Sequence, residues 1–553
     1  MSRSATGAAF LLLAASAHSA ATPSISLQDD ARLADALAVP DERLVRAHVQ
    51  FLADDVLEGR APGTRGGATA ARYIRAQFQQ AGLQPGASNG TFFEPVRMTG
   101  VYPSPSIVIG IARRTMALRY LEDFVAWPTG PDAALVADAD IVFAGYGIVA
   151  PEWKWDDYKA SPVTGKIAMI LPGGPEFSDS TRVDGRTWTR YRRWDYKLEQ
   201  AARMGAIGAI LVHTDEGVSN PWSAVRNTWS GERLQLEAGA NRSLKFGIWM
   251  SEAATRRIIA ATGIDYDLLL RRTARQDFRP ITIGAHAVVD IASRVRPVES
   301  VNVIAKLPAQ NPAGGEAVVL MAHYDHLGVA SAAGTDSIFN GAIDNASGVA
   351  TMLMAAAGLA AAGSPDRRTI YFVATTAKES GSLGAASYLN SPPVPLSQTA
   401  AVINIDGGNL WGATRDLAAL DAEQSTLDAS VRSVVGIEGM LLSEAPAPTA
   451  GLFFGSDHYM FARRGVPALS IAGGLDFLDR PAGWGLEQVE DYVANHYHGP
   501  SDEVEADFRY DGAVQHARIL IRLAWHLAGP VPFPVWHETS EFRSAGRALQ
   551  RGR

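Results

Sequence analysis

The chain has 553 residues, enough for two or more domains, and its 47% hydrophobic and 20% charged residues are typical of a globular protein. Fifty Lys and Arg against 58 Asp and Glu give a formal net charge of −8, which argues against a nucleic-acid-binding protein, because such proteins carry basic surfaces. No cysteine is present, so disulfides, iron–sulfur clusters and thiol nucleophiles are excluded, and any metal must bind to His, Asp or Glu.

Residues 1–21 combine a basic start, a short apolar run and small residues, the pattern of a secretory signal peptide. The alternative is a buried N-terminal helix. The apolar run is short for a membrane span, and no later stretch reaches about 18 consecutive apolar residues. We therefore expect an exported protein, periplasmic or secreted, without a membrane span.

The segment 22–134 begins with helical patterns and continues with strands. Apolar periodicity and an acidic first turn predict a helix over 41–52. A Gly- and Pro-rich loop at 59–67 separates it from a second amphipathic helix over 68–81. From about residue 91 to 149 the pattern favours short strands joined by turns.

Residues 135–290 are predicted to form a separate, smaller module. Strand patterns at 141–149 and 165–171 are followed by a helix over 195–204 and a strand over 205–213. No dense cluster of metal-type ligands occurs in this stretch of the sequence. We interpret it as a β-rich α+β domain inserted into the chain without catalytic residues of its own.

Residues 291–553 alternate between strands and helices, which predicts an α/β fold with a mixed, mostly parallel sheet flanked by helices. Continuous apolar runs are typical of strands that are buried on both faces. The predicted strands are 317–322, 368–376, 401–405 and 468–472, and the predicted helices are 347–363, 383–390 and 512–527.

Ligand-type side chains in this region stand in loops, mostly where predicted strands end. Open α/β sheets bind ligands outside the carboxyl ends of their strands. Each signal alone is weak, since a single Asp before a helix is an ordinary N-cap. Together, two imidazoles and three carboxylates suit two zinc ions that share one bridging carboxylate. The segments concerned are His323-Tyr-Asp325-His326, Asp344-Asn-Ala-Ser-Gly348, Lys378-Glu379-Ser-Gly381, Asp406-Gly-Gly408 and His498-Gly-Pro-Ser-Asp502.

These segments resemble, in order, the successive motifs of the M28 family of co-catalytic zinc aminopeptidases and carboxypeptidases. The motifs are Ala322–Gly328, Asn340–Gly348, Glu379–Gly384, Asn404–Asp406 and Tyr497–Asp502. The 135–290 module is similar to the protease-associated domain that is often inserted in this family. Residues 22–134 and 291–553 would then form the peptidase domain. Residues 59–63 resemble the family's N-terminal entry segment.

The resemblance implies two zinc ions, with cobalt or manganese as alternatives. His323 and Asp406 would bind one ion. Glu379 and His498 would bind the other, and Asp344 would bridge the two. These five residues are the metal ligands that we expect from the family motifs.

The resemblance also assigns residues around the ligands. Asp325 would accept a hydrogen bond from His323 and so fix the orientation of the imidazole. The segment Ser456-Asp457-His458 resembles a further family motif, and Asp457 and His458 would lie near the pocket without binding the metal directly.

Lys378 departs from the family pattern, which has Glu-Glu where this chain has Lys378-Glu379. The first Glu of the family is the general base, and a protonated lysine accepts no proton. Hydrolysis would then be impaired, since general acid–base catalysis is typically worth about 10²–10⁴-fold. Two other interpretations are that the metals lower the pKa of Lys378 enough for it to act as the base, or that its ammonium binds a substrate carboxylate.

The expected function is thus that of an exported di-zinc exopeptidase, an aminopeptidase acting on peptide or protein substrates, with activity reduced by Lys378. One alternative is an inactive zinc-binding homologue or a catalytic mutant. Another is a transferase similar to glutaminyl cyclases. Carboxypeptidase specificity also remains open, and the sequence carries no signal for an oligomeric state.

Overall fold

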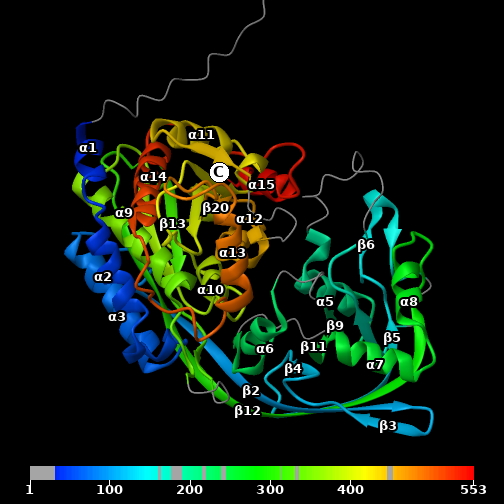
Figure 1. Cartoon of the computed structure of the whole chain (residues 1–553). Helices are drawn as coiled ribbons and strands as arrows, with labels where there is room; N and C mark the ends of the chain where they lie inside the picture. Colours follow the sequence, from blue (N-terminus) through cyan, green and yellow to red (C-terminus); the bar gives the residue numbers. More distant parts are fainter. Residues whose placement is uncertain are drawn as a thin grey trace, which may run out of the picture.

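The structure, a computed structural model, describes residues 31–159, 163–175, 190–214, 220–237, 244–312, 314–330, 336–444 and 452–552. The signal peptide predicted at residues 1–21 lies outside the described residues, and it stays a prediction. Two units share one continuous sheet, and Figure 1 shows them side by side with two long strands running beneath both. The larger unit has a core of residues from 33–92 and 301–528.

The two long strands are β2 (Phe93–Ile111) and β12 (Ile281–Leu307). They pair antiparallel from Phe93 opposite Val303 to Ile111 opposite Ala285. The C-terminal end of β12 pairs with β16 (Thr369–Thr375) of the larger unit, and its N-terminal end pairs with β5 (Ala134–Phe143) of the smaller one. The strand pair therefore fixes the position of one unit relative to the other.

The sheet of the larger unit is mostly parallel, as predicted. Strand β13 (Ala317–His323) lies between β16 and β17 (Thr399–Ile405), and β17 continues in parallel to β20 (Ala468–Gly473). All seven residues of β13 are buried, because helices cover both faces of the sheet. Strand β18 (Asp416–Leu420) pairs antiparallel to β20, and the short strand β19 (Leu441–Ser443) pairs with β18 at the edge.

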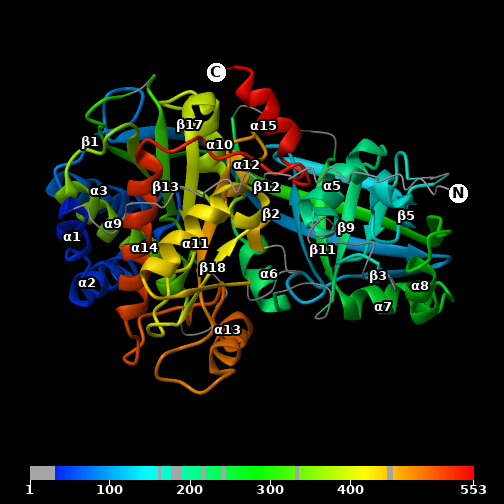
Figure 2. The same cartoon turned by 90° about the horizontal axis from the view of Figure 1, so that it is seen from above.

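Helices cover both faces of this sheet, as Figure 2 shows from above. Helix α9 (Gly348–Ala362) approaches α14 (Asp511–Ala528) closely, since a Cβ on Gly358 would lie 2.5 Å from the Cδ1 of Ile521. On this face also lie α1 (Ala31–Leu37), α2 (Glu42–Leu52), α3 (Arg65–Gln80) and α11 (Leu427–Ile437). The other face carries α10 (Leu383–Asn390), α12 (Asp457–Ala462) and α15 (Arg543–Gln550).

The smaller module, defined here as residues 107–291, has its own two-sided core. Its strands β5, β8 (Ile167–Ile170), β9 (Gly208–His213) and β11 (Phe246–Ser251) are parallel, and β4 (Phe124–Pro128) is antiparallel to β11. Ile107, Ile109 and Phe124 belong to this core, ahead of the boundary predicted at residue 135. Its identity as a protease-associated domain stays a prediction. Its helices are α5 (Trp194–Arg203), α6 (Trp222–Ser230), α7 (Glu252–Ala261) and α8 (Tyr266–Thr273).

The remaining elements are short, apart from one further helix of 12 residues. The helices are η1 (Asp55–Arg60), η2 (Pro151–Trp153), η3 (Ala342–Ser347), η4 (Leu396–Gln398), η5 (Ala422–Gln424), η6 (Leu452–Gly455) and α13 (Trp484–Asn495). The strands are β1 (Gln84–Pro85), β3 (Arg114–Ala117), β6 (Val149–Ala150), β7 (Trp155–Asp156), β10 (Arg233–Leu236), β14 (Gly328–Val329), β15 (Ile338–Phe339) and β19 (Leu441–Ser443).

Two strand predictions are wrong in detail. The strand predicted at 141–149 ends at Phe143, because Gly145 and Gly147 adopt φ of +59° and +66°, which turns the chain out of the sheet. In the region predicted as short strands from residue 91 to 149, the first strand is the 19-residue β2, and the short strands β3 and β4 follow it. Its Pro103 and Pro105 are tolerated because, in the described sheet, β2 has a single partner strand at these positions, and a proline can occupy an open edge.

The helical stretch Ala342–Ala362 is the one helix of the described residues that is long and apolar enough to cross a membrane by length and composition. Within the protein, 83% of its apolar window is buried. A core helix passes the same test, and this one packs against the sheet and α14. Its hydropathy is therefore accounted for by its place in the core.

Candidate metal centre

The structure brings the five predicted ligands together at the carboxyl edge of the parallel strands. His323 ends β13, Asp406 follows β17 directly, and Glu379 stands a few residues after β16. Asp344 lies in η3, ahead of α9, and His498 lies in the loop after α13. The strand ends meet at one edge because the three strands are parallel neighbours.

One group of ligand atoms, which we call the sheet-side triad, consists of His323, Asp406 and one oxygen of Asp344. The Nε2 of His323 lies 3.0 Å from Oδ1 of Asp406 and 3.1 Å from Oδ1 of Asp344. The side chain of His323 is 1% exposed. These three residues could hold a metal ion, since their ligand atoms lie within 4.8 Å of one another.

A second group, the module-side triad, consists of His498, Glu379 and the other oxygen of Asp344. The Nε2 of His498 lies 3.2 Å from Oδ2 of Asp344 and 3.2 Å from Oε2 of Glu379. Asp344 therefore presents one carboxylate oxygen to each triad. This is the arrangement that a carboxylate bridging two ions requires.

His326 is a further ligand candidate that the sequence analysis did not assign. Its ring, Asp344 and Glu379 offer ligand atoms within 4.8 Å of one another, and Nδ1 lies 3.8 Å from Oε1 of Glu379. The ring is 1% exposed, and neither nitrogen has a hydrogen-bond partner among the described residues. Its place three residues after His323, in the same loop, was the available sequence signal.

The Asp344 loop is held by two buried side chains. The Asp502 carboxylate accepts hydrogen bonds from the backbone N–H groups of Ile343, at 2.9 Å, and Asp344, at 3.0 Å. The Asn345 amide donates to the carbonyl of His323, at 3.2 Å, and to the carbonyl of Ile405, at 3.0 Å. Asn345 thus connects the Asp344 loop to the ends of β13 and β17. Neither residue carries a sequence signal of its own beyond its position in a motif.

Asp325 supports the site in a different way from that predicted. Its carboxylate lies 3.7 Å from Nδ1 of His323, beyond hydrogen-bond distance, and the ring instead lies 3.2 Å from the Asp325 carbonyl oxygen. The carboxylate accepts the backbone N–H groups of Lys378, at 3.1 Å, and Glu379, at 3.3 Å. The Asp325 side chain therefore positions the peptide that carries Glu379, while its carbonyl orients His323.

Lys378 points into the ligand cluster. Its Nζ lies 3.2 Å from Oε1 of Glu379, 3.5 Å from Oδ1 of Asp406 and 3.7 Å from Oδ1 of Asp344. The last two oxygens are the ones that His323 faces, so the ammonium shares the oxygens of the sheet-side triad. Burial lowers the pKa of Lys378, but the surrounding carboxylates raise it more, to well above its ordinary value. Without metal ions the lysine is therefore a cation at this position, and its interpretation as a base, which requires bound metals to lower the pKa, stays a prediction.

The carboxylates of the cluster are ionised. Burial raises the pKa of Asp344 and of Glu379, but Lys378 and the neighbouring imidazoles hold both well below their ordinary values. The donors are thus buried carboxylate oxygens and imidazole nitrogens, and the His326 nitrogens have no other partner in the described structure. This donor set fits zinc, which binds His, Asp and Glu.

Asp457 and His458 lie behind the ligands, at the start of α12. Asp457 accepts a hydrogen bond from Thr375 at the end of β16, and burial raises its pKa to about 6. His458 accepts from Asn404 of β17 at 3.3 Å, and burial lowers its pKa to about 3. Both residues brace strand ends next to the ligands. Their predicted place near the pocket stays a prediction.

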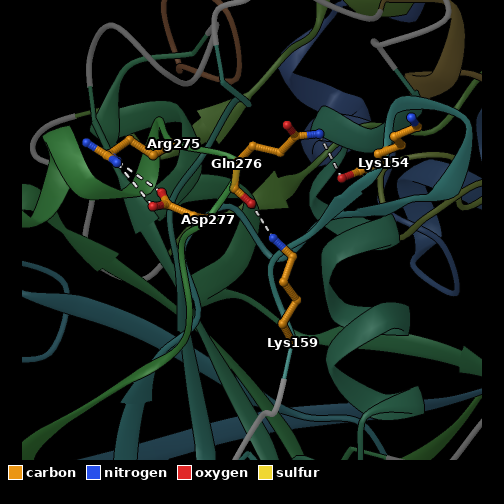
Figure 3. A pocket seen from close by; sticks show the side chains of 5 residues that line it. All are labelled: Lys154, Lys159, Arg275, Gln276 and Asp277. Atoms are coloured by element: carbon orange, nitrogen blue, oxygen red, sulfur yellow. Dashed lines mark hydrogen bonds and ion pairs between the residues drawn. The ribbon is translucent and has the colours of Figure 1, made fainter.

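A surface depression on the smaller module, shown in Figure 3, offers no comparable chemistry. It has a volume of about 570 Å³. Its side chains pair with their neighbours: Arg275 binds Asp277 at 2.9 Å, and Gln276 donates to the carbonyl of Lys154 at 3.0 Å. The depression has a single carboxylate and no imidazole in its lining, which also includes Lys159. The triads are therefore the stronger candidate site.

Comparison with known proteins supports this assignment. Residues 302–524 match the model of Peptidase family M28. A similar solved structure is the aminopeptidase from Aneurinibacillus sp. strain AM-1, at 18% identity and a TM-score of 0.52, covering 92% of this chain and 98% of that one. At this identity the likeness shows the fold.

Two further structures resemble the chain at lower TM-scores. The peptidase M28 precursor from Shewanella amazonensis SB2B has 18% identity and a TM-score of 0.48, covering 92% of this chain and 100% of that one. BSAP, a zinc aminopeptidase from Bacillus subtilis, has 17% identity and a TM-score of 0.47, covering 91% and 97%. A search of curated proteins found no match. The family match over residues 302–524 contains all five predicted ligands.

Proposed function

We propose that the chain is an exported zinc exopeptidase, an aminopeptidase that removes N-terminal residues from peptides and binds two zinc ions bridged by Asp344. The observation that carries the proposal is the placement of one Asp344 oxygen in each triad, 3.1 Å from His323 and 3.2 Å from His498. The family match supports peptidase chemistry. The names of two similar proteins, an aminopeptidase and a zinc aminopeptidase, support the specificity.

The residues of the two triads would hold the ions. Zinc bound there would polarise the scissile carbonyl and make the attacking water more acidic. The three ionised carboxylates, Asp344, Glu379 and Asp406, offset the charge of the ions. Asp325 and Asn345 keep the ligands in place through their bonds to the Glu379 backbone and to the β13 and β17 ends. The buried site excludes bulk water, which strengthens each electrostatic contact.

Lys378 sets the level of turnover in this proposal. It stands where the family has its general base, and an ammonium donates protons but accepts none. We expect hydrolysis to be reduced by about 10²–10⁴-fold relative to a chain with glutamate at this position. The ammonium also competes with a metal ion for Oδ1 of Asp406 and Oδ1 of Asp344. Its shortest contact, 3.2 Å, is to Oε1 of Glu379, whereas Oε2 of Glu379 is the oxygen that faces His498. The sheet-side ion would therefore be the more weakly bound of the two.

Zinc content and peptidase activity test the proposal together. The unchanged chain and Lys378→Glu are loaded with zinc, and hydrolysis of a panel of aminoacyl p-nitroanilides is measured. We expect weak activity in the unchanged chain and strong activity in Lys378→Glu. N-acetylated versions of the same substrates should resist cleavage, because an aminopeptidase needs a free N-terminus.

Two results would contradict the proposal. Equal activity in the two chains would show that Lys378 does not limit turnover. Cleavage of the N-acetylated substrates, or of peptides from the C-terminal end, would replace aminopeptidase specificity with another. The double variant Asp344→Asn, Lys378→Glu is the control, since it keeps the new glutamate and lacks the bridging carboxylate.

A further inference from the structure

Helix α6 of the smaller module reaches the loop that carries His498. It is the helix of that module nearest the larger unit in both Figure 1 and Figure 2. The Asn227 amide donates a hydrogen bond to the His498 carbonyl at 2.9 Å. The Thr228 hydroxyl lies 2.6 Å from Nδ1 of the His498 ring. A residue 270 positions earlier in the chain thus contacts a ligand of the module-side triad.

The direction of the second hydrogen bond follows from proton counting. A threonine hydroxyl has one proton and two acceptor sites. Oγ1 of Thr228 also lies 2.7 Å from the backbone carbonyl of Ala224, which can only accept, so the hydroxyl proton goes there. The hydroxyl oxygen then accepts from Nδ1–H of His498. In a neutral ring with its proton on Nδ1, the lone pair is on Nε2, which faces Asp344 and Glu379 at 3.2 Å.

The same helix also holds the backbone of His498. This residue has φ of +54°, a left-handed conformation that a residue with a side chain rarely adopts without support. Asn227 binds the carbonyl group of this residue, next to the strained torsion. Helix α6 therefore contacts the backbone of His498 as well as its ring, and both contacts come from successive residues.

Helix α6 is itself fixed in the core of the smaller module. The Trp229 ring lies 4.1 Å from the ring of Trp127 and 4.9 Å from that of Trp194, measured between centroids. The Arg233 guanidinium stacks over Trp229 at 4.0 Å and donates to the Thr228 carbonyl at 3.1 Å. The position of Thr228 is thus set by the packing of the module.

We infer that Thr228 is a positioning residue of the metal centre, which holds His498 with Nε2 free to bind the module-side ion, so that the smaller module completes the peptidase site. The inference rests on the proposed function, because it takes the triads to be metal sites. Neighbours of a metal-binding histidine that accept its second N–H typically change metal affinity by 10–100-fold when they are replaced. The smaller module is then required for full zinc occupancy.

The test compares Thr228→Val, which removes the hydroxyl at nearly constant shape, with Thr228→Ser, which restores it. Thr273→Val is the matched control, since Thr273 is a buried helical threonine of the same module whose hydroxyl binds a carbonyl four residues earlier at 2.8 Å. Each full-length chain is loaded with zinc and titrated with a chelator. We expect Thr228→Val to lose one of its two ions at about 10–100-fold lower chelator concentration, and the other two variants to match the unchanged chain.

A second measurement needs no variant at Thr228. With ¹⁵N-labelled histidine, the zinc-loaded chain should show the His498 ring protonated at Nδ1, with the signal assigned by its absence in His498→Gln. Protonation at Nε2 would overturn the inference, as would a Thr228→Val chain that retains both ions like the unchanged one. If the unchanged chain binds no zinc at all, the proposed function is contradicted, and so is the inference that rests on it. Two bound ions that are indifferent to Thr228 would overturn the present inference alone.

Discussion

The two triads share Asp344, but different elements of the fold hold their other ligands, and Lys378 contacts them differently. The sheet-side triad takes His323 and Asp406 from the ends of adjacent parallel strands, so the backbone of the sheet fixes their positions. The module-side triad takes His498 from a loop in a left-handed conformation, and a helix of the smaller module holds it. Lys378 lies 3.7 Å from Oδ1 of Asp344 and 3.5 Å from Oδ1 of Asp406 in the sheet-side triad, and 3.2 Å from Oε1 of Glu379 in the module-side triad.

The triad whose ligands are held more rigidly is therefore not expected to bind its ion more tightly. In the sheet-side triad, whose ligands the strands hold, the ammonium contacts both oxygens that face His323. In the module-side triad, which depends on a second unit, the ammonium contacts Oε1 of Glu379, and the oxygens that face His498 are Oε2 of Glu379 and Oδ2 of Asp344. We therefore expect the charge of Lys378 to weaken ion binding at the sheet-side triad more, although the strands hold the ligands of that triad more firmly.

The largest effect is expected from Asp344→Asn, which breaks both triads at once. Removing the shared carboxylate should abolish the binding of both ions and reduce the activity of a Lys378→Glu chain to background. Zinc content after gel filtration measures this directly. Asp457→Asn is the matched control, as a buried carboxylate in the neighbouring helix α12. A control that also lost both ions would show that the loss does not depend on bridging.

Lys378→Gln should separate the effect of the ammonium charge on zinc binding from the effect of the missing general base, because it removes the charge without adding a base. Zinc affinity of the sheet-side triad is expected to rise about tenfold or more, since a unit charge about 4 Å away interacts strongly in a partly buried site. Activity should remain low, unlike in Lys378→Glu. Calorimetric zinc titration resolves the two binding steps. A rise at the module-side triad that equals or exceeds the rise at the sheet-side triad would contradict the expected order.

Asp325→Asn should act mainly on the module-side triad. The amide accepts through one oxygen where the carboxylate accepts through two, so the Glu379 backbone loses support while the carbonyl contact to His323 remains. We expect about 10–100-fold weaker binding of the module-side ion. The same titration measures the change, and a loss confined to the sheet-side ion would be the contrary result.

Tyr492→Phe is expected to have the smallest effect of these variants and to affect both triads equally. The Tyr492 hydroxyl donates to Oδ2 of Asp502 at 3.0 Å, and Asp502 holds the loop of the shared Asp344. Its removal should lower the free energy of unfolding by about 1 kcal/mol, the usual value of one hydrogen bond. Denaturant unfolding of the metal-free chain measures this. Weaker binding of one ion alone would contradict the expectation that the Asp344 loop supports both triads equally.

Local sequence pattern and strand order were enough to predict part of the site. His323 and Asp406 follow apolar runs that could only be buried strands, so their meeting at one sheet edge was predictable. Thr228 was not, because nothing in its surroundings relates it to a histidine 270 residues later. His326 was visible in its motif but received no role. The long β2 was hidden by its prolines, whose tolerance depends on an open edge that is a property of the folded sheet.

Anomalous diffraction from crystals of the zinc-loaded chain, unchanged and with Lys378→Glu, tests the account most directly, because it measures each position separately. We predict full zinc occupancy between Glu379 and His498 in both chains. Between His323 and Asp406, occupancy should be partial in the unchanged chain and full in the variant. Full occupancy of this second position in the unchanged chain, with the Lys378 ammonium still beside Asp406, would contradict the account.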